Sequence, residues 1–88
     1  MRHENLTMAR VVLLGRLRDI AGWRERVIEP APPSLAALRA ILASEHPALG
    51  EALAGKGVQA AVNKLLTRDD VALSAGDEVA FLPPMSGG

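Results

Sequence analysis

The chain ends in EVAFLPPMSGG (residues 78–88), which joins a short β-strand to an unusual tail. Residues 78–82 alternate in side-chain size and contain β-forming types, so they predict a strand. Pro83 cannot donate a backbone hydrogen bond to a neighbouring strand, and the predicted strand ends there. Residues 83–88 are therefore expected to leave the sheet as a flexible C-terminal tail.

The tail carries few chemical groups. Gly87-Gly88 has no side chains and can enter a channel too narrow for other residues. A terminal glycine pair occurs by chance in roughly one chain in 200. Pro83-Pro84 favours an extended path, and Gly88 can reach roughly 14 Å beyond Pro84 at about 3.5 Å per residue. The hydroxyl of Ser86 and the thioether of Met85 react weakly, so the terminal carboxylate of Gly88 is the candidate reactive group.

A carboxylate is a poor electrophile and has to be activated, most simply as an acyl-adenylate made from ATP. The chain contains no glycine-rich phosphate-binding loop, so another enzyme would use the ATP and this chain would bind no cofactor. It also contains no cysteine, which excludes a thiol nucleophile on this chain. The tail thus predicts a chain without catalytic residues of its own, whose C-terminal carboxylate another enzyme activates.

Length and composition predict one small cytoplasmic domain covering residues 1–88. Ten basic residues balance ten acidic ones, unlike the basic surface of a nucleic-acid binder. There is no apolar run long enough to span a bilayer, and residues 1–8 lack the apolar stretch of a signal peptide. Met8 is a possible start, and a disordered extension is expected over residues 1–8. His3 and His46 have no neighbours that suggest a metal site.

The predicted elements follow the order strand, strand, helix, then two or three strands. Ser34 is a good N-cap for the helix, whose apolar residues recur at helical spacing until Pro47. A further helical turn is expected around residues 47–55, and a tight turn with Gly76 at positive φ precedes the last strand. The remaining predicted strands are residues 9–14, 24–30, 58–63 and a short one at 65–66. The prediction is an α+β fold, a mixed sheet of four to five strands with one main helix on one face.

One helix can cover only one side of a sheet. Because side chains alternate along a strand, Val79 and Phe81 should share one face, and Ala80 and Leu82 the other. We expect part of the set Leu14, Leu66 and Leu82 to be exposed as a partner site. The alternative, that loops cover these leucines, is equally open.

Two segments, VNKLLTRDDVALSAGDEVAFLPPMSGG (62–88) and LRDIAG (17–22), resemble the small subunit of molybdopterin synthase, a ubiquitin-like sulfur-carrier family. The resemblance extends from about residue 9 to residue 88 and implies a ubiquitin-like β-grasp fold. It implies that Gly88 is adenylated, converted to a thiocarboxylate, and donates sulfur to cyclic pyranopterin monophosphate to form the molybdopterin dithiolene. Gly87 would be the narrow residue before Gly88, which lets the tail pass through a channel too narrow for other residues.

The resemblance also implies partners. They are the large subunit of molybdopterin synthase, in a heterotetramer, and an adenylating enzyme of the ubiquitin-activating type. Leu14, Leu66 and Leu82 match positions that form apolar partner contacts in the family, although an aromatic residue often stands in place of Leu14 and Leu82. Arg18, in the second matched segment, either pairs with an acid of this chain or meets a partner.

Two other functions compete with this one. The first is a sulfur carrier for another pathway, such as thiamine or another thiolated product. The Pro83-Pro84 pair and the chain length favour the molybdopterin carrier. The second is a β-grasp interaction module that performs no covalent chemistry and whose Gly-Gly end is incidental.

Overall fold

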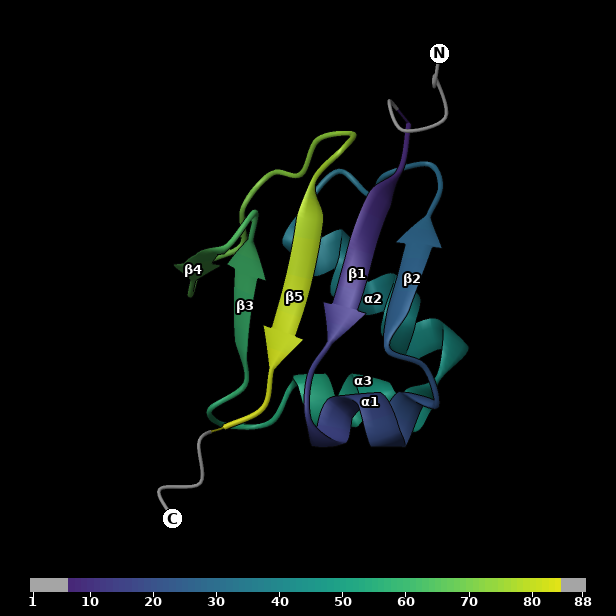
Figure 1. Cartoon of the computed structure of the whole chain (residues 1–88), viewed down its shortest axis with the longest axis vertical. Coiled ribbons are helices and arrows are strands. Elements are labelled where there is room, and N and C mark those ends of the chain that lie inside the picture. The colour runs from purple at the N-terminus through teal and green to yellow at the C-terminus, as the bar shows by residue number, and fades with distance from the viewer. Residues whose placement is uncertain (1–6, 85–88) are drawn as a thin grey trace.

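A computed structural model of the chain describes residues 7–84. Eight elements follow one another along the chain and form a single sheet with three helices (Figure 1). They are β1 (Ala9–Leu13), α1 (Arg16–Ala21), β2 (Glu25–Ile28), α2 (Leu35–Glu45), α3 (Pro47–Leu53), β3 (Gln59–Val62), β4 (Leu65–Thr67) and β5 (Glu78–Leu82).

The sheet has five strands in the order β2-β1-β5-β3-β4. Its two central members, β1 and β5, run parallel, whereas the other neighbours are antiparallel. The predicted mixed sheet is therefore confirmed. Its first two strands form a hairpin whose wide loop contains α1. Because β1 and β5 point the same way, Leu14 and Pro83 leave the sheet at the same end (Figure 1).

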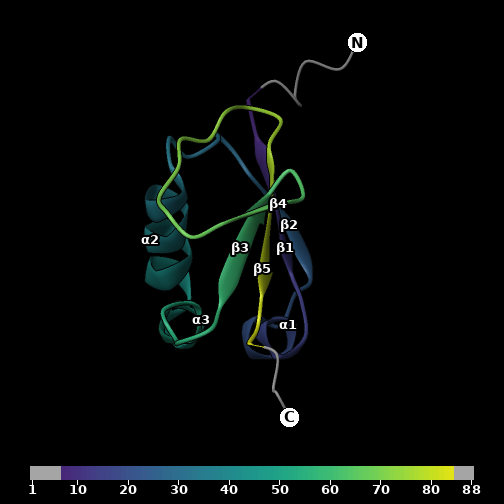
Figure 2. The same cartoon turned by 90° about the vertical axis from the view of Figure 1, so that its left-hand side faces the viewer.

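The helices α2 and α3 lie together on one face of the sheet, and α1 lies at its lower end (Figure 2). The predicted N-cap of α2 is confirmed, since the Ser34 hydroxyl accepts a hydrogen bond from the Ala37 N–H at 3.1 Å. A second donor of the first turn, the Ala36 N–H, is bound by Asp70 Oδ1 at 2.8 Å. Residues 47–53 form a full helix, longer than the single turn expected from the sequence.

The core lies between this helical layer and the sheet. Val11, Leu13, Val79 and Phe81 are fully buried on the strands, and they pack with the α2 and α3 leucines in one cluster. The predicted alternation of the last strand is confirmed, because Ala80 and Leu82 stay partly exposed on the opposite side. Alternation thus gives the sheet a helix-covered face and an open face.

Order begins before the first strand. The Thr7 carbonyl accepts a hydrogen bond from the Ala31 N–H at 2.8 Å, and the Met8 carbonyl accepts one from the Gly76 N–H at 2.7 Å. Thr7 and Met8 are therefore each hydrogen-bonded to a loop, and the disordered extension over residues 1–8 stays a prediction. Residues 1–6 lie outside the described residues.

A two-residue turn joins β3 to β4. Val62 pairs with Leu65, and Asn63 and Lys64 between them have φ angles of 50° and 72°. Both central residues of such a hairpin turn must adopt positive φ, which asparagine tolerates far better than lysine. The turn sets the position of β4, which carries Leu66.

Lys64→Gly should therefore stabilise the domain. Relief of the left-handed conformation is worth about 1–2 kcal/mol, and the added freedom of glycine in the unfolded chain offsets about 0.4–1 kcal/mol of it. We expect a net gain of about 0.5–1 kcal/mol in the free energy of unfolding, measured by urea denaturation. Lys64→Ala, which keeps the strained φ, serves as the control and should give no gain; equal stabilisation by both variants would refute the explanation.

Candidate functional site

The candidate site begins where β5 ends. Pro83 is half-buried and Pro84 is exposed, so the chain leaves the domain at this point. Both prolines line a recess of about 200 Å³ together with Arg16, Lys56 and Val58. The remaining predicted tail residues, Met85, Ser86, Gly87 and Gly88, lie outside the described residues.

A row of apolar side chains crosses the open face of the sheet. Leu66 pairs with Ala61, Ala61 pairs with Ala80, and Ala80 pairs with Val12. Residues directly opposite each other in neighbouring strands point to the same side of a sheet. These four side chains therefore form one continuous strip, which is not covered by any helix (Figure 2).

The three predicted interface leucines lie on this same face. Leu82 follows Ala80 by two residues, and Leu14 follows Val12 by two, so both point to the open side. The Leu14 N–H continues the ladder by donating to the Phe81 carbonyl at 3.1 Å. Leu66 is 61% exposed and Leu14 38%, while Leu82 is half-buried. The structure thus places Leu14 and Leu82 at the end of the face from which the tail leaves, whereas Leu66 lies on the edge strand β4, level with Ala80.

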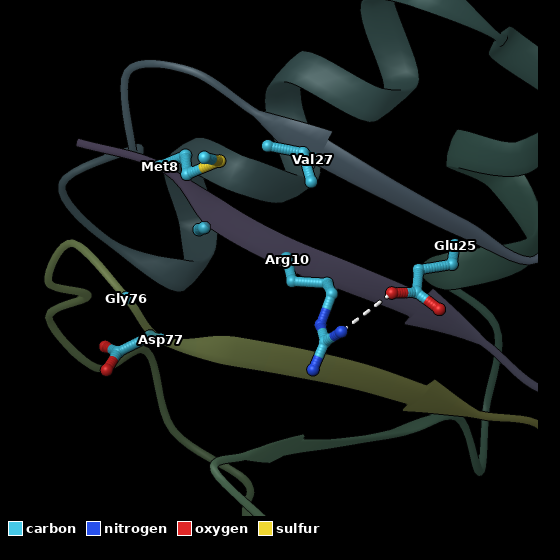
Figure 3. A pocket seen from close by; sticks show the side chains of 7 residues that line it. Met8, Arg10, Glu25, Val27, Gly76 and Asp77 are labelled. Atoms are coloured by element: carbon cyan, nitrogen blue, oxygen red, sulfur yellow. Dashed lines mark hydrogen bonds and ion pairs between the residues drawn. The ribbon is translucent and has the colours of Figure 1, made fainter. Parts of the chain in front are cut away.

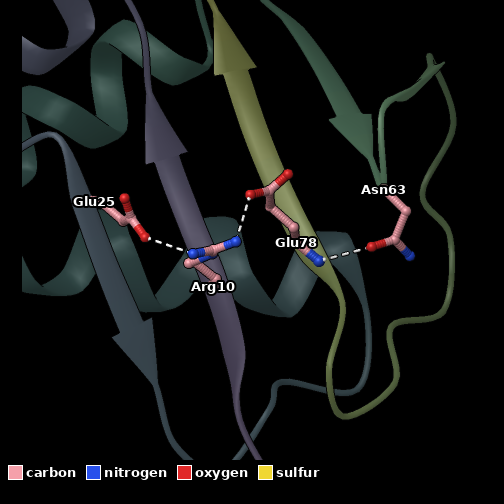
Figure 4. Close-up of polar contacts among 4 residues, drawn as sticks. All are labelled: Arg10, Glu25, Asn63 and Glu78. Carbon is pink, nitrogen blue, oxygen red and sulfur yellow. Dashed lines mark hydrogen bonds and ion pairs between the residues drawn. The ribbon is translucent and has the colours of Figure 1, made fainter. Parts of the chain in front are cut away.

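The other end of the open face is polar. Arg10 lies between two carboxylates, with Nη1 3.0 Å from Glu25 Oε2 and Nη2 3.1 Å from Glu78 Oε2 (Figure 4). The Asn63 side chain accepts from the Glu78 N–H at 3.0 Å and donates to Asp77 Oδ1 at 2.9 Å. Exposed ion pairs add little stability, so the main effect of this polar cluster is to divide the open face into a charged end and an apolar end.

A shallow recess of about 440 Å³ lies beside this polar cluster. Figure 3 shows Met8, Val27 and Asp77 around Arg10, whose guanidinium is already paired with Glu25. Across residues 7–84 no three His, Cys, Asp or Glu side chains are placed to hold a metal ion. None of the helices formed by these residues is long and apolar enough to cross a membrane.

Two other sequence candidates have local partners. Arg18 Nε lies 3.9 Å from the carboxylate of its neighbour Asp19, and both side chains are largely exposed. His46 ends α2 and begins α3, and its Nδ1 accepts a hydrogen bond from the Leu49 N–H at 3.3 Å. His46 is thus a helix cap, a role that the Pro47 after it could have suggested.

A model of the ThiS family matches residues 11–88, which is nearly the whole described domain and the tail after it. The chain belongs to the ThiS family. It is 35% identical over 81 residues to the molybdopterin synthase sulfur carrier subunit of Escherichia coli K12, covering 92% of this chain and all of that protein. The resemblance found in the sequence is confirmed.

Solved structures agree on the fold of this ThiS-family chain. SAMP1 from Haloferax volcanii superposes with a TM-score of 0.79 at 26% identity, covering 92% of this chain and 99% of that one. A chain from the complex of subunits 1 and 2 of the molybdopterin-converting factor of Helicobacter pylori 26695 gives a TM-score of 0.68 at 29% identity, with coverage of 92% and 99%. The ubiquitin-like β-grasp prediction is confirmed.

Sequence reasoning missed the polar half of the open face. Arg10, Glu25 and Glu78 come from three strands, and only the pairing register brings their side chains together. One signal was available, because Arg10 and Glu78 are each followed two residues later by an apolar residue of the open face. The alternation therefore placed Arg10 and Glu78 on the open face, although it could not show that their side chains form an ion pair.

The two faces of the sheet should differ sharply in what they contribute to stability. Phe81→Ala removes a fully buried ring and should lower the free energy of unfolding by about 3–5 kcal/mol. Leu66→Ala, on the open face, should change it by no more than about 0.5 kcal/mol. Urea denaturation measures both, and a loss above about 2 kcal/mol for Leu66→Ala would place that residue in the core.

Proposed function

We propose that this chain is the sulfur-carrier subunit of a molybdopterin synthase and that the Gly88 carboxylate carries the sulfur. The observation that supports this most directly is the identity to the E. coli carrier subunit, which covers that protein from end to end. The fold contributes a second argument. It releases the tail beside an apolar strip that no helix covers, so a partner can bind the domain and receive the tail at once.

The proposed chemistry takes place at one carbon atom. In an activating enzyme, the Gly88 carboxylate attacks the α-phosphorus of ATP and pyrophosphate leaves, which gives an acyl-adenylate. A sulfur donor at the oxidation level of sulfide then attacks the acyl carbon and AMP leaves, which gives a thiocarboxylate. The thiocarboxylate sulfur then attacks a carbon of cyclic pyranopterin monophosphate, from which an oxygen substituent leaves. Water hydrolyses the resulting thioester, which restores the Gly88 carboxylate and leaves the sulfur on the pterin, and two such deliveries complete the dithiolene.

The open face of the sheet is the proposed docking surface. Leu14, Leu66 and Leu82 supply apolar contacts to the large subunit of the synthase and to the adenylating enzyme. The H. pylori structure is a complex of subunits 1 and 2 of its molybdopterin-converting factor, which supports a two-subunit assembly. This chain supplies the carrier group in the cytoplasm, and the partners supply ATP binding and the catalytic residues.

A carrier for another thiolation pathway is the second candidate. The similarity to SAMP1, with a TM-score of 0.79, supports it. The same β-grasp domain and glycine tail would serve both carriers, so the partner distinguishes them. Sulfur transfer to a pterin by this chain with a synthase large subunit supports the first candidate, and loading without such transfer supports the second.

The end of the chain should be critical for transfer and irrelevant for folding. One residue added after Gly88 turns its carboxylate into an amide and moves the terminal carboxylate roughly 3.5 Å outward, and deletion of Gly88 withdraws it by the same distance. Since a 1 Å misplacement can cost about a hundredfold in rate, both changes should abolish dithiolene formation. The assay contains the activating enzyme, sulfide, the large subunit and the pterin precursor.

The native tail is the positive control, and the urea unfolding midpoint should be the same for all three chains because the core ends at Leu82. Normal dithiolene formation by an untrimmed extended or shortened tail would show that Gly88 is not the carrier. The proposed function would then be wrong.

Leu66→Asp should weaken docking without unfolding the domain. A charge in an apolar interface has to be desolvated, and loss of a central contact typically costs about 2 kcal/mol, or roughly thirtyfold in Kd. Leu65→Asp is the matched control, because Leu65 is the next residue of β4, is 75% exposed and points to the opposite face. Titration calorimetry with the large subunit should separate them, and equal weakening would rule out the open face as the docking surface.

A further inference from the structure

Two glycines lie against Pro83 and Pro84, which form the root of the tail. A Cβ atom placed on Gly15 would lie 2.9 Å from Cγ of Pro83, and one placed on Gly57 would lie 2.7 Å from Cβ of Pro84. Real Cβ atoms essentially never approach other heavy atoms this closely. The two prolines therefore occupy a slot that exists only because neither neighbour has a side chain.

The two glycines come from separate loops at the same end of the sheet. Gly15 lies between β1 and α1 with φ of 57°, and Gly57 lies between α3 and β3 with φ of 84°. These loops lie at the lower end of the sheet, where β5 ends (Figure 1). The slot is thus built from two glycines that lie 42 residues apart in the sequence. It contacts Pro83 and Pro84, the first two residues of the tail.

We propose that Gly15 and Gly57 act as a collar that sets the direction in which the C-terminal tail leaves the domain. This inference rests on the proposed function and makes both glycines positioning residues for the Gly88 carboxylate. Proline rings have fixed φ angles, so holding Pro83 and Pro84 fixes the first part of the path.

Preorganisation explains why such a collar is useful to a carrier. A tail whose first two residues, Pro83 and Pro84, are already held in place loses less conformational freedom when it enters a partner's channel. The collar acts on the path of the tail, whereas Leu14, Leu66 and Leu82 act on docking. A change in the collar should therefore affect the rate of transfer from the docked state more than the affinity of docking.

Gly22 provides a matched control for the backbone effect. It has the same φ of 84° as Gly57, but a Cβ there would meet no atom within 4 Å. Alanine at either position adopts the same unfavourable backbone conformation. Only Gly57→Ala also displaces Pro84.

The experiment compares the wild-type chain, Gly57→Ala and Gly22→Ala, each full-length and loaded as the C-terminal thiocarboxylate. Single-turnover sulfur transfer to the pterin precursor is measured with saturating large subunit, and Kd is measured separately by calorimetry. We expect Gly57→Ala to slow transfer by at least about tenfold with Kd within about threefold, and Gly22→Ala to stay within about twofold of wild type in both.

Pro84→Gly tests the same contact from the tail side. Pro84 is exposed, so this variant keeps the core intact and should also slow transfer from the docked state. Wild-type transfer rates in Gly57→Ala and Pro84→Gly would overturn the collar, as would equal slowing by Gly57→Ala and Gly22→Ala. If Gly57→Ala does not fold, the transfer rate of Pro84→Gly alone tests the collar. Failure of the wild-type chain to transfer sulfur would instead refute the proposed function.

Discussion

The parallel pairing of β1 with β5 is the contact on which the other features of this domain depend. It joins the first and last strands of the chain at the centre of the sheet, and it aligns Val11 with Val79 and Leu13 with Phe81. All four side chains are fully buried under the helices. The same alignment places Val12 beside Ala80 on the open face and makes both strands end at the edge from which the tail leaves. A slip of one residue would exchange the two faces and bury the polar cluster.

Local patterns in the sequence predicted the elements well, because their causes are local. The alternation of Val79 and Phe81 with Ala80 and Leu82 identified both faces of the last strand, and the Ser34 hydroxyl identified the start of α2. The resemblance of the C-terminal segment to a known family then supplied the β-grasp topology. The tail root was visible as Pro83-Pro84, since proline acts through its own ring.

Features that depend on register could not be predicted from the sequence. The pairing of Arg10 with Glu25 and Glu78 needs the register of three strands, and neither charge pattern nor spacing defines that register. The slot around Pro83 and Pro84 is similar, because Gly15 and Gly57 read as ordinary turn glycines until the fold places prolines against them. The interface leucines are an intermediate case, since alternation gave their face but the exposure of Leu66 depends on its place in an edge strand.

Leu14, Leu82 and the root of the tail lie at one end of the open face, and this limits how the proposed carrier can work. Two large partners cannot occupy the same strip at once, so an activating enzyme and a synthase subunit would have to take turns. Each round of delivery then includes a release, and the residence time on each partner sets an upper limit on throughput. Aliphatic side chains at Leu14 and Leu82 present a smaller contact area than aromatic rings. A smaller contact area favours rapid dissociation from each partner.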